Sequence, residues 1–569
     1  MNTATLPWLT LLVAVPVMAG ALLFVPALRR VARPVGLGVS LLVLLGAIAA
    51  VVTDFDLGAA GEHQLTEQVA WIPQIGASYA LGIDGLGLTM VLLTAFLVPV
   101  VLISGVPVRA GDDEATTERR TSTYVGLVLV LEGILLAVFA ARDVFLFYVL
   151  FEAMLLPIFL LIGMYGGPRR RAAAIKFLLY SLAGGLIMLA GVVALYLEGP
   201  GGPEGFLVEN LAGTMAGSSD WAARLIFLAF LVAFAIKAPM VPVHTWLPDA
   251  AEQSPGGVST LLVGVMDKVG TFGMITLLLT IFPEQVAWAA PVMIVLAVIS
   301  VLYGAFLAIG QQDVMRLVAF TSVSHFGFIV LGVFVGSELA LTGAMFYMVA
   351  HGLSTAGMFL GSEYLVRRGG TQRIGAFGGY QRVVPVLAGT WLVMGLASIA
   401  LPGLSGFWGE YMVLLGTFEV SWVAAAFAVL GVVLAALYVL MPYQRIFTGP
   451  APLAATPARA TATVGAASGN AAPSSGAAGT GTAASDTGST ASAAPDDDAP
   501  PRPLALPDLD GRERTVMGLL VAAVLALGLF PAPVVELVRP VAEQTVVLAD
   551  DAGDTASQPS PITTVGSAL

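Results

Sequence analysis

The sequence predicts an all-α polytopic membrane protein of about fourteen transmembrane helices, two of them broken. Of the 569 residues, 57% are hydrophobic and only 11% are charged, whereas a soluble globular domain carries about 25% charged residues. The apolar residues fall in runs of the roughly 20 residues that a spanning helix needs. Prolines interrupt two of these runs, the seventh and the twelfth.

Fourteen apolar runs are long enough to cross a bilayer. They lie at 7–27, 35–52, 82–104, 122–141, 143–163, 173–197, 223–245, 257–282, 287–310, 314–335, 338–364, 384–415, 420–443 and 514–538. The first run lacks a cleavage signature followed by soluble sequence, so it is expected to be a retained span rather than a signal peptide. Residues 53–80 are too polar to span, and Trp71 and Tyr79 favour a small hairpin at the outer interface, where aromatic side chains settle.

Basic residues are distributed unevenly between the two sets of loops. Twenty of the 25 lie after odd-numbered helices, whereas only Arg142, Arg224 and Arg539 lie on the opposite side. Loops rich in basic residues stay in the cytoplasm. An even number of helices therefore places both termini outside the cytoplasm.

Features that recur five helices apart suggest two internal repeats. The broken seventh and twelfth spans are five apart, and Asp143-Val144 opens the fifth helix as Asp313-Val314 opens the tenth. The predicted parts are helices one to three with the hairpin (1–110), helices four to eight (120–282), helices nine to thirteen (287–446), a linker (447–510), helix fourteen (511–540) and a flexible tail (541–569). The linker is almost all Ala, Ser, Thr, Gly, Pro and Asp and is expected to be disordered and cytoplasmic, because it cannot bury enough apolar surface to order itself. A docking tail is the alternative.

The composition excludes several kinds of chemistry. With no cysteine, the chain holds no thiolate-ligated Fe–S cluster, no disulfide and no cysteine nucleophile. The sequence has no metal-ligand spacing, phosphate loop or nucleophile triad. The net charge of −12 lies mostly in loops and tails, so no nucleic-acid partner is expected. The partner that the composition implies is the lipid bilayer.

Four charged side chains lie in membrane-like sequence, where a charge costs roughly 2.5–3.5 kcal/mol even on the lenient insertion scale. Glu152 lies in DVFLFYVLFEAMLLPIFLLIG and Lys268 in VSTLLVGVMDKVGTFGMITLLL. Lys237 and Glu410 stand beside the two proline breaks, in FAIKAPMVPVHTWLPDAAEQSP and MGLASIALPGLSGFWGEYMVLLG. Broken helices at membrane depth line cavities that hold ions and water, and a buried lysine releases its proton readily.

Three histidines are candidates for auxiliary roles. His325 and His351 lie in the tenth and eleventh helices, and His244 lies beside the seventh-helix break. Imidazole titrates near neutral pH, so these groups could relay protons. Each ionisable group also has a static interpretation: a neutral hydrogen-bonded acid, a lysine that reaches the interface, a fixed Lys–acid pair or a satisfied core histidine. Together the series indicates a proton path across the membrane interior.

Six motifs carry a resemblance to a known family. They are GIDGLGLTMVLLT (82–94), FYVLFEAMLLPIFLLIG (147–163), AIKAPMVPVHTWLPDA (235–250), SVSHFGF (322–328), AHGLSTAGMFL (350–360) and LPGLSGFWGEY (401–411). From about residue 65 to 445 the chain resembles the antiporter-like membrane subunits of respiratory complex I (NADH–quinone oxidoreductase), which are related to Mrp-type cation/proton antiporter subunits. The linker at 447–510 and Asp267 beside Lys268 depart from the family's pattern.

The resemblance implies two inverted five-helix repeats and a role for each buried charge. The family pairs a glutamate on helix five with a lysine on helix seven, which here are Glu152 and Lys237. A lysine on helix eight carries the proton to the centre, and a titratable group on helix twelve releases it; these match Lys268 and Glu410. The two other large subunits of this kind carry lysine on helix twelve, so the glutamate points to the middle one.

The implied function is proton translocation coupled to remote NADH-to-quinone electron transfer, in the membrane arm of a translocase of the bacterial inner membrane. No cofactor is expected in this chain, because FMN, the Fe–S clusters and the quinone would be held by partner subunits. The expected partners are other complex I membrane subunits, especially the two flanking antiporter-like ones. The alternatives are an Mrp-type Na⁺/H⁺ antiporter subunit, a membrane subunit of an energy-converting hydrogenase, and a membrane scaffold.

Overall fold

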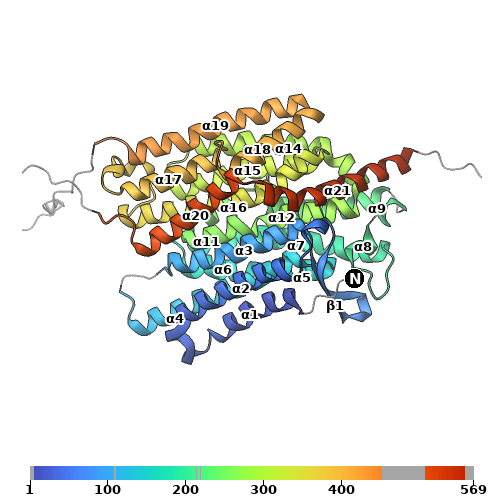
Figure 1. The fold of residues 1–569 in the computed structure, drawn as a ribbon, viewed down its shortest axis with the longest axis horizontal. Helices are drawn as coiled ribbons and strands as arrows, with labels where there is room; N and C mark the ends of the chain where they lie inside the picture. The colour runs from blue at the N-terminus through green and yellow to red at the C-terminus, as the bar shows by residue number, and fades with distance from the viewer. Residues whose placement is uncertain (1–5, 108–110, 213, 218–219, 451–505, 558–569) are drawn as a thin grey trace, which may run out of the picture.

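Long helices lying side by side make up most of the structure (Figure 1). The computed structural model describes residues 6–107, 111–212, 214–217, 220–450 and 506–557. The longer helices are α1 (Trp8–Leu22), α2 (Ala32–Asp54), α3 (Gly85–Ser104), α4 (Glu114–Ala140), α5 (Val144–Ala153), α6 (Leu155–Tyr165), α7 (Arg170–Glu198), α9 (Asp220–Lys237), α14 (Pro283–Ile309), α15 (Val314–Phe334), α16 (Glu338–Gly369), α17 (Pro385–Ser398), α18 (Ser405–Val420), α19 (Trp422–Phe447), α20 (Gly511–Leu529) and α21 (Ala532–Ser557). The shorter ones are α8 (Val208–Leu211), α10 (Trp246–Gln253), α11 (Gly256–Leu261), α12 (Lys268–Gly273) and α13 (Leu279–Ile281).

Ten helical segments in the described part of the chain are long and apolar enough to cross a membrane, or eleven if the bent pair α20–α21 is one span. A polytopic all-α membrane fold is therefore confirmed, while α1 and α17 are apolar but shorter than these spans. The apolar run predicted as the fourteenth span, 514–538, is not one continuous helix. The chain bends by 65° between α20 and α21, because Pro531 cannot continue α20.

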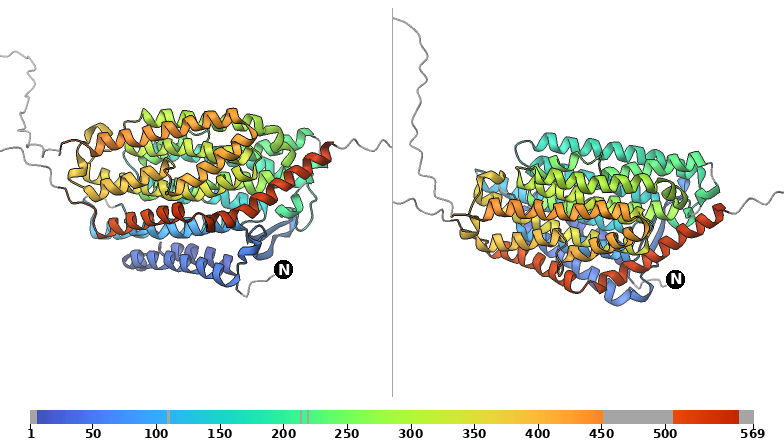
Figure 2. Two further views of the ribbon diagram at one scale, coloured as in Figure 1. Left: turned by 45° about the horizontal axis from the view of Figure 1, so that its top comes forward. Right: turned by 90° about the horizontal axis from the view of Figure 1, so that it is seen from above.

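The helices differ in how much of their surface the rest of the chain covers. Helices α3, α4, α15 and α16 and the segment 256–281 are mostly or wholly buried, whereas α2, α7, α14 and α19 expose a large apolar surface. Figure 2 shows α1 and α2 at one side of the bundle and α17 to α19 at the other, and α20 and α21 pack on α3 and α16 between them. The outer helices thus present the apolar surface that lipid requires.

The polar segment after α2 folds as the predicted hairpin. Strands β1 (Gln64–Ile72) and β2 (Ala77–Ile83) pair antiparallel, with Val69 opposite Tyr79. Glu67 on β1 accepts hydrogen bonds from the backbone N–H groups of Leu9 and Thr10. The hairpin therefore also holds the start of α1.

Two helices are interrupted where prolines predicted it. Helix α9 ends at Lys237 and α10 begins only at Trp246, while α17 ends at Ser398 and α18 begins at Ser405. At the first break the side chain of Trp246 donates to the carbonyl of Ile236 at 2.8 Å. The break therefore persists inside the bundle because a side chain satisfies a carbonyl that the helix no longer uses.

The segment 256–281 contains two π-helical turns that the sequence did not predict. They span Leu262–Met266 and Met274–Leu278. Asp267 and α12, which begins with Lys268, lie between them. Isolated π turns inside α-helices frequently mark functional sites.

The structure describes only part of the region for which the linker and the C-terminal tail were predicted. Most of the predicted linker, 451–505, lies outside the described residues, as does 558–569. The predicted flexible tail begins at 541, whereas α21 continues to Ser557. The buried side chains Val538, Val541, Ala542 and Thr545 recur at helical spacing, so α21 packs through one face over these residues.

A buried ion pair is expected to hold α20 against α16. Arg368 pairs with Glu513 at 2.5 Å, and both side chains are only 9% exposed. Removing one partner of such a pair costs about 3–5 kcal/mol, so Arg368→Met should lower the thermal midpoint of the purified protein. Arg367→Met is the control, because Arg367 is 39% exposed and its ion pair is with Glu363 on the same helix, a contact worth about 0.3–0.5 kcal/mol. Equal melting of the two variants would show that this pair does not anchor α20.

Candidate functional site

Buried ionisable side chains extend through the centre of the bundle from α5 to α18. Glu152 lies on α5, Lys237 at the end of α9, Lys268 at the start of α12, and Glu410 on α18. Between the last two lies His351 of α16. Apart from the partly buried Glu152, each of these side chains is at most 2% exposed. The structure therefore brings the four residues predicted for the proton path into one buried series.

Glu152 and Lys237 are neighbours without being in contact. The carboxyl of Glu152 lies against Gly185 of α7, where an added Cβ would stand only 1.6 Å from Oε1. Lys237 Nζ lies 5.1 Å from the ring centre of Phe151 and 5.7 Å from that of Phe177. This ammonium has no hydrogen-bond partner among the described residues, so the aromatic faces are its nearest stabilising groups.

A serine lies between these two groups. Phe177, Ser181 and Gly185 follow at intervals of four residues and therefore share one face of α7. Phe177 adjoins Lys237, and Gly185 adjoins Glu152. The buried hydroxyl of Ser181 also lacks a partner within the described part of the chain. The predicted Glu–Lys pair is thus seen here in a separated arrangement.

Lys268 is bonded towards the second half of the chain. Its Nζ lies 2.8 Å from Nδ1 of His351 and donates to the carbonyl oxygen of Val263 at 2.6 Å. Val263 belongs to the first π turn. The irregular backbone therefore supplies an acceptor for the lysine in a region without water-exposed groups.

Aromatic and imidazole rings continue the series to Glu410. Tyr347 lies one helical turn before His351 on α16, with ring centres 6.3 Å apart, and its hydroxyl donates to Glu410. The ring of His325 lies 5.1 Å from that of His351. Nε2 of His325 and the hydroxyl of Tyr438 share a hydrogen bond of 2.8 Å. Hydroxyls and imidazoles can both donate and accept protons. Ring contacts rather than hydrogen bonds link His351 to this cluster, because its Nε2 has no hydrogen-bond partner among the described residues.

His244 lies apart from this series. Its ring packs at 5.3 Å from Tyr303 of α14 and at 6.4 Å from Phe320 of α15. No hydrogen bond or ring contact of the described residues joins it to Lys237 or Lys268.

Three buried polar residues of this region, Glu132, Tyr347 and Tyr438, were missed from the sequence, and Asp267 was noted there without a role. Glu132 of α4 is fully buried and its two oxygens lack partners in the described part of the chain, as do those of Asp267. Glu132 interrupts the apolar run VLVLEGILLA, a signal that could have been used. Tyr347 could have been found by its spacing of four residues from His351. Tyr438 has no such signal, because tyrosine is common in apolar helices.

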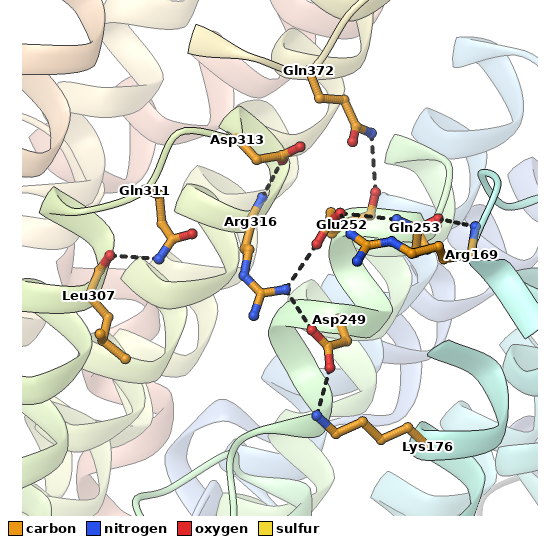
Figure 3. Close-up of polar contacts among 10 residues, drawn as sticks. All are labelled: Arg169, Lys176, Asp249, Glu252, Gln253, Leu307, Gln311, Asp313, Arg316 and Gln372. Atoms are coloured by element: carbon orange, nitrogen blue, oxygen red, sulfur yellow. Dashed lines mark hydrogen bonds and ion pairs between the residues drawn. The ribbon is translucent and has the colours of Figure 1, made fainter. Parts of the chain in front are cut away.

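A second polar cluster surrounds α10 at one end of the bundle (Figure 3). Arg316 of α15 donates from one nitrogen to Asp249 at 2.5 Å and to Glu252 at 2.9 Å. Lys176 of α7 donates to the other oxygen of Asp249 at 2.6 Å, and Arg169 pairs with Glu252. These ion pairs hold α10, the segment that follows the break after Lys237, between α7 and α15.

The charge of Asp249 follows from these contacts. Burial by itself would raise the pKa of this carboxyl, but the hydrogen bonds and charges of Lys176 and Arg316 hold the pKa below its ordinary value. Asp249 therefore stays ionised at neutral pH and acts as a fixed anchor for both cations.

A membrane helix bundle with a buried series of acids, lysines and histidines defines a class: polytopic proteins that move ions or protons. Residues 141–436 match the family model described as NADH:quinone oxidoreductase/Mrp antiporter, and the chain belongs to this family. It is 40% identical over 590 residues to NADH-quinone oxidoreductase subunit M of Mycobacterium tuberculosis (strain CDC 1551 / Oshkosh), with 98% of each chain covered. The resemblance to antiporter-like subunits of complex I is therefore confirmed.

Two solved structures share the fold. One is respiratory complex I from Thermus thermophilus with bound NADH, with a TM-score of 0.76 and 32% identity over 95% of this chain and 99% of that chain. The other is the Mrp complex from Dietzia sp. DQ12-45-1b, with a TM-score of 0.77 and 25% identity over 96% and 99%. Both neighbours belong to complexes of several subunits. The partners that this similarity indicates for the chain are therefore other membrane subunits.

Asp313 gives a pH-dependent prediction. It caps α15 by accepting from the N–H of Arg316 at 3.0 Å, and burial raises its pKa from 3.8 to about 6. The native state therefore binds this proton more tightly than the unfolded state, and stability should fall as the pH rises from 3.8 through about 6. Asparagine also caps helices but does not titrate, so Asp313→Asn should gain thermal stability over the wild type at neutral pH and lose that gain in acid. A difference that stays constant with pH would contradict the assignment.

Proposed function

We propose that the chain acts as the counterpart of subunit M in a bacterial NADH–quinone oxidoreductase and translocates protons across the membrane. The observation that carries the mechanism is the bond of 2.8 Å between Lys268 and His351, because it joins the acid–lysine region of the first half to the ring cluster of the second. Redox energy would come from NADH-to-quinone electron transfer in other subunits. In this chain only protons and charges would move.

The proposed path starts at Glu152 and Lys237, passes through Lys268 and ends at Glu410. When Glu152 approaches Lys237, its carboxylate stabilises the ammonium form. When the two part, as in the arrangement described above, Lys237 can release its proton towards Lys268. His351 and Tyr347 then form the link to Glu410, since they are in successive contact.

We also propose the finer architecture of fourteen spans with two inverted five-helix repeats. Matching local features support it: Asp143 accepts from the N–H of Leu146 at the start of α5, as Asp313 accepts from that of Arg316 at the start of α15. Each aspartate also forms an isolated bridge with a distant loop. The breaks after α9 and after α17 are a second matching pair.

In this proposal both termini lie outside the cytoplasm, and the linker 447–510 lies within it. The ion pairs around Asp249 would then be at the cytoplasmic face, where protons enter. FMN, Fe–S clusters and quinone would be bound by partner subunits, and the two nearest partners would be the flanking antiporter-like subunits. The absence of cysteine supports this division of labour for the thiolate-bound clusters.

An Mrp-type Na⁺/H⁺ antiporter subunit is the second candidate, because the Dietzia Mrp complex has the same fold at a TM-score of 0.77. A membrane subunit of an energy-converting hydrogenase is a third. The sequence identity of 40% to a complex I subunit over 98% of the chain, against 25% to the Mrp neighbour, favours the first candidate.

Glu152→Gln in the native host tests the proposal. The variant keeps the shape of the side chain but cannot carry charge, so NADH-driven quinone reduction and proton uptake by isolated membranes should fall together, by about tenfold or more. Glu536→Gln is the control, because Glu536 is exposed on α21. Assembly of the complex is checked in both variants by native gel electrophoresis.

The outcomes separate the candidates. If Glu152→Gln leaves NADH oxidation unchanged but abolishes tolerance of sodium or alkali, the chain is an antiporter subunit. If neither activity changes in an assembled complex, Glu152 does not lie on a transport path.

A further inference from the structure

Asp267 is a buried acid that the proposed path does not use. Its side chain is fully buried, and neither carboxyl oxygen has a hydrogen-bond partner among the described residues. It occupies the single position between the π turn Leu262–Met266 and α12. A carboxyl group that only stabilised the fold would be expected to have hydrogen-bond partners in this environment.

The side of the helix that carries Asp267 packs on the end of α9. An added Cβ on Gly270 would lie 2.6 Å from the backbone nitrogen of Ala238 and 2.7 Å from the carbonyl oxygen of Phe234. Residues three apart in a helix share a face. Asp267 therefore lies on the side that faces the last turn of α9, which ends at Lys237.

Asp267 is also adjacent in sequence to Lys268. Its carboxyl therefore lies beside both lysines, next to Lys268 in the chain and on the side of the helix that faces the end of α9 at Lys237. The Nζ atom of Lys268 is meanwhile hydrogen-bonded to His351 and to the backbone of Val263. Both carboxyl oxygens thus remain free to exchange a proton.

We propose that Asp267 is a proton-carrying residue between Lys237 and Lys268. The inference rests on the proposed function and adds one group to its path. The ammonium of Lys237 gives a proton to the carboxylate, which leaves a neutral amine and a carboxylic acid. The acid then gives the proton to the neutral amine of Lys268, which restores the carboxylate, so no further reactant is required.

Asp267→Asn tests this in the intact complex reconstituted into liposomes, where NADH-driven quinone reduction and acidification of the lumen are measured together. Both rates should fall by about tenfold or more, because asparagine keeps the volume but cannot hold the proton. Asp267→Glu should recover most of the loss, since it keeps the carboxyl group. Thr260→Val is the control and should behave as the wild type, because Thr260 is a buried, unpartnered and uncharged polar residue of the same span.

The other possible results of these assays each contradict a specific claim. If Asp267→Asn pumps at the wild-type rate, or if its defect is not repaired by Asp267→Glu, Asp267 does not carry protons. If Asp267→Asn does not assemble, Asp267→Ser takes its place in the same assays, and normal pumping by that variant overturns the inference.

Lys237→Met and Lys268→Met are measured in parallel. Loss of pumping in both lysine variants, with normal pumping in the neutral Asp267 variants, would remove the inference and leave the proposed function standing. Normal pumping in all of them would remove the proposed function itself.

Discussion

The structure depends on one constraint: a charge inside an apolar medium must have a partner or give up its proton. The outer helices satisfy it by exposing apolar side chains, and the central helices gather the acids, lysines and histidines where protein surrounds them. The separated Glu152 and Lys237 do not satisfy it fully, because the lysine contacts aromatic rings and has no hydrogen-bond partner among the described residues. A group held in this way responds strongly to small movements of a neighbouring charge.

Irregular backbone is what makes such a series possible. The end of α9 places Lys237 at a helix terminus, and the π turn before Asp267 offers the carbonyl of Val263 to Lys268. In water these backbone groups would have many partners, but at membrane depth each must find one within the protein. The ion pairs around Asp249 keep the far side of the first break in place.

The sequence predicts the fold class and the main charges because both are strong signals in an apolar chain. Residue type alone is enough to identify the four buried charges Glu152, Lys237, Lys268 and Glu410. Prolines predict the two helix breaks. Tyr438 could not be predicted, since a tyrosine in an apolar helix is ordinary and its role depends on which helix lies opposite. The π turns have no compositional signature either, because hydrogen-bond register is set by tertiary packing. Pro531 is a sequence signal for the bend between α20 and α21. The prediction did not use it, because apolar residues continue on both sides of the proline.

The paired π turns also bear on how this span can change over evolutionary time. A π turn contains one residue more than an α-helix fits at that point, and one residue corresponds to a rotation of about 100°. The stretch between the turns, from Asp267 to Gly273, is thus rotated relative to both ends of its helix. Deleting one residue from 262–266 would turn Lys268 away from His351, although the protein would still contain all of its buried charged residues. The length of this span is therefore as tightly constrained as the identity of its residues.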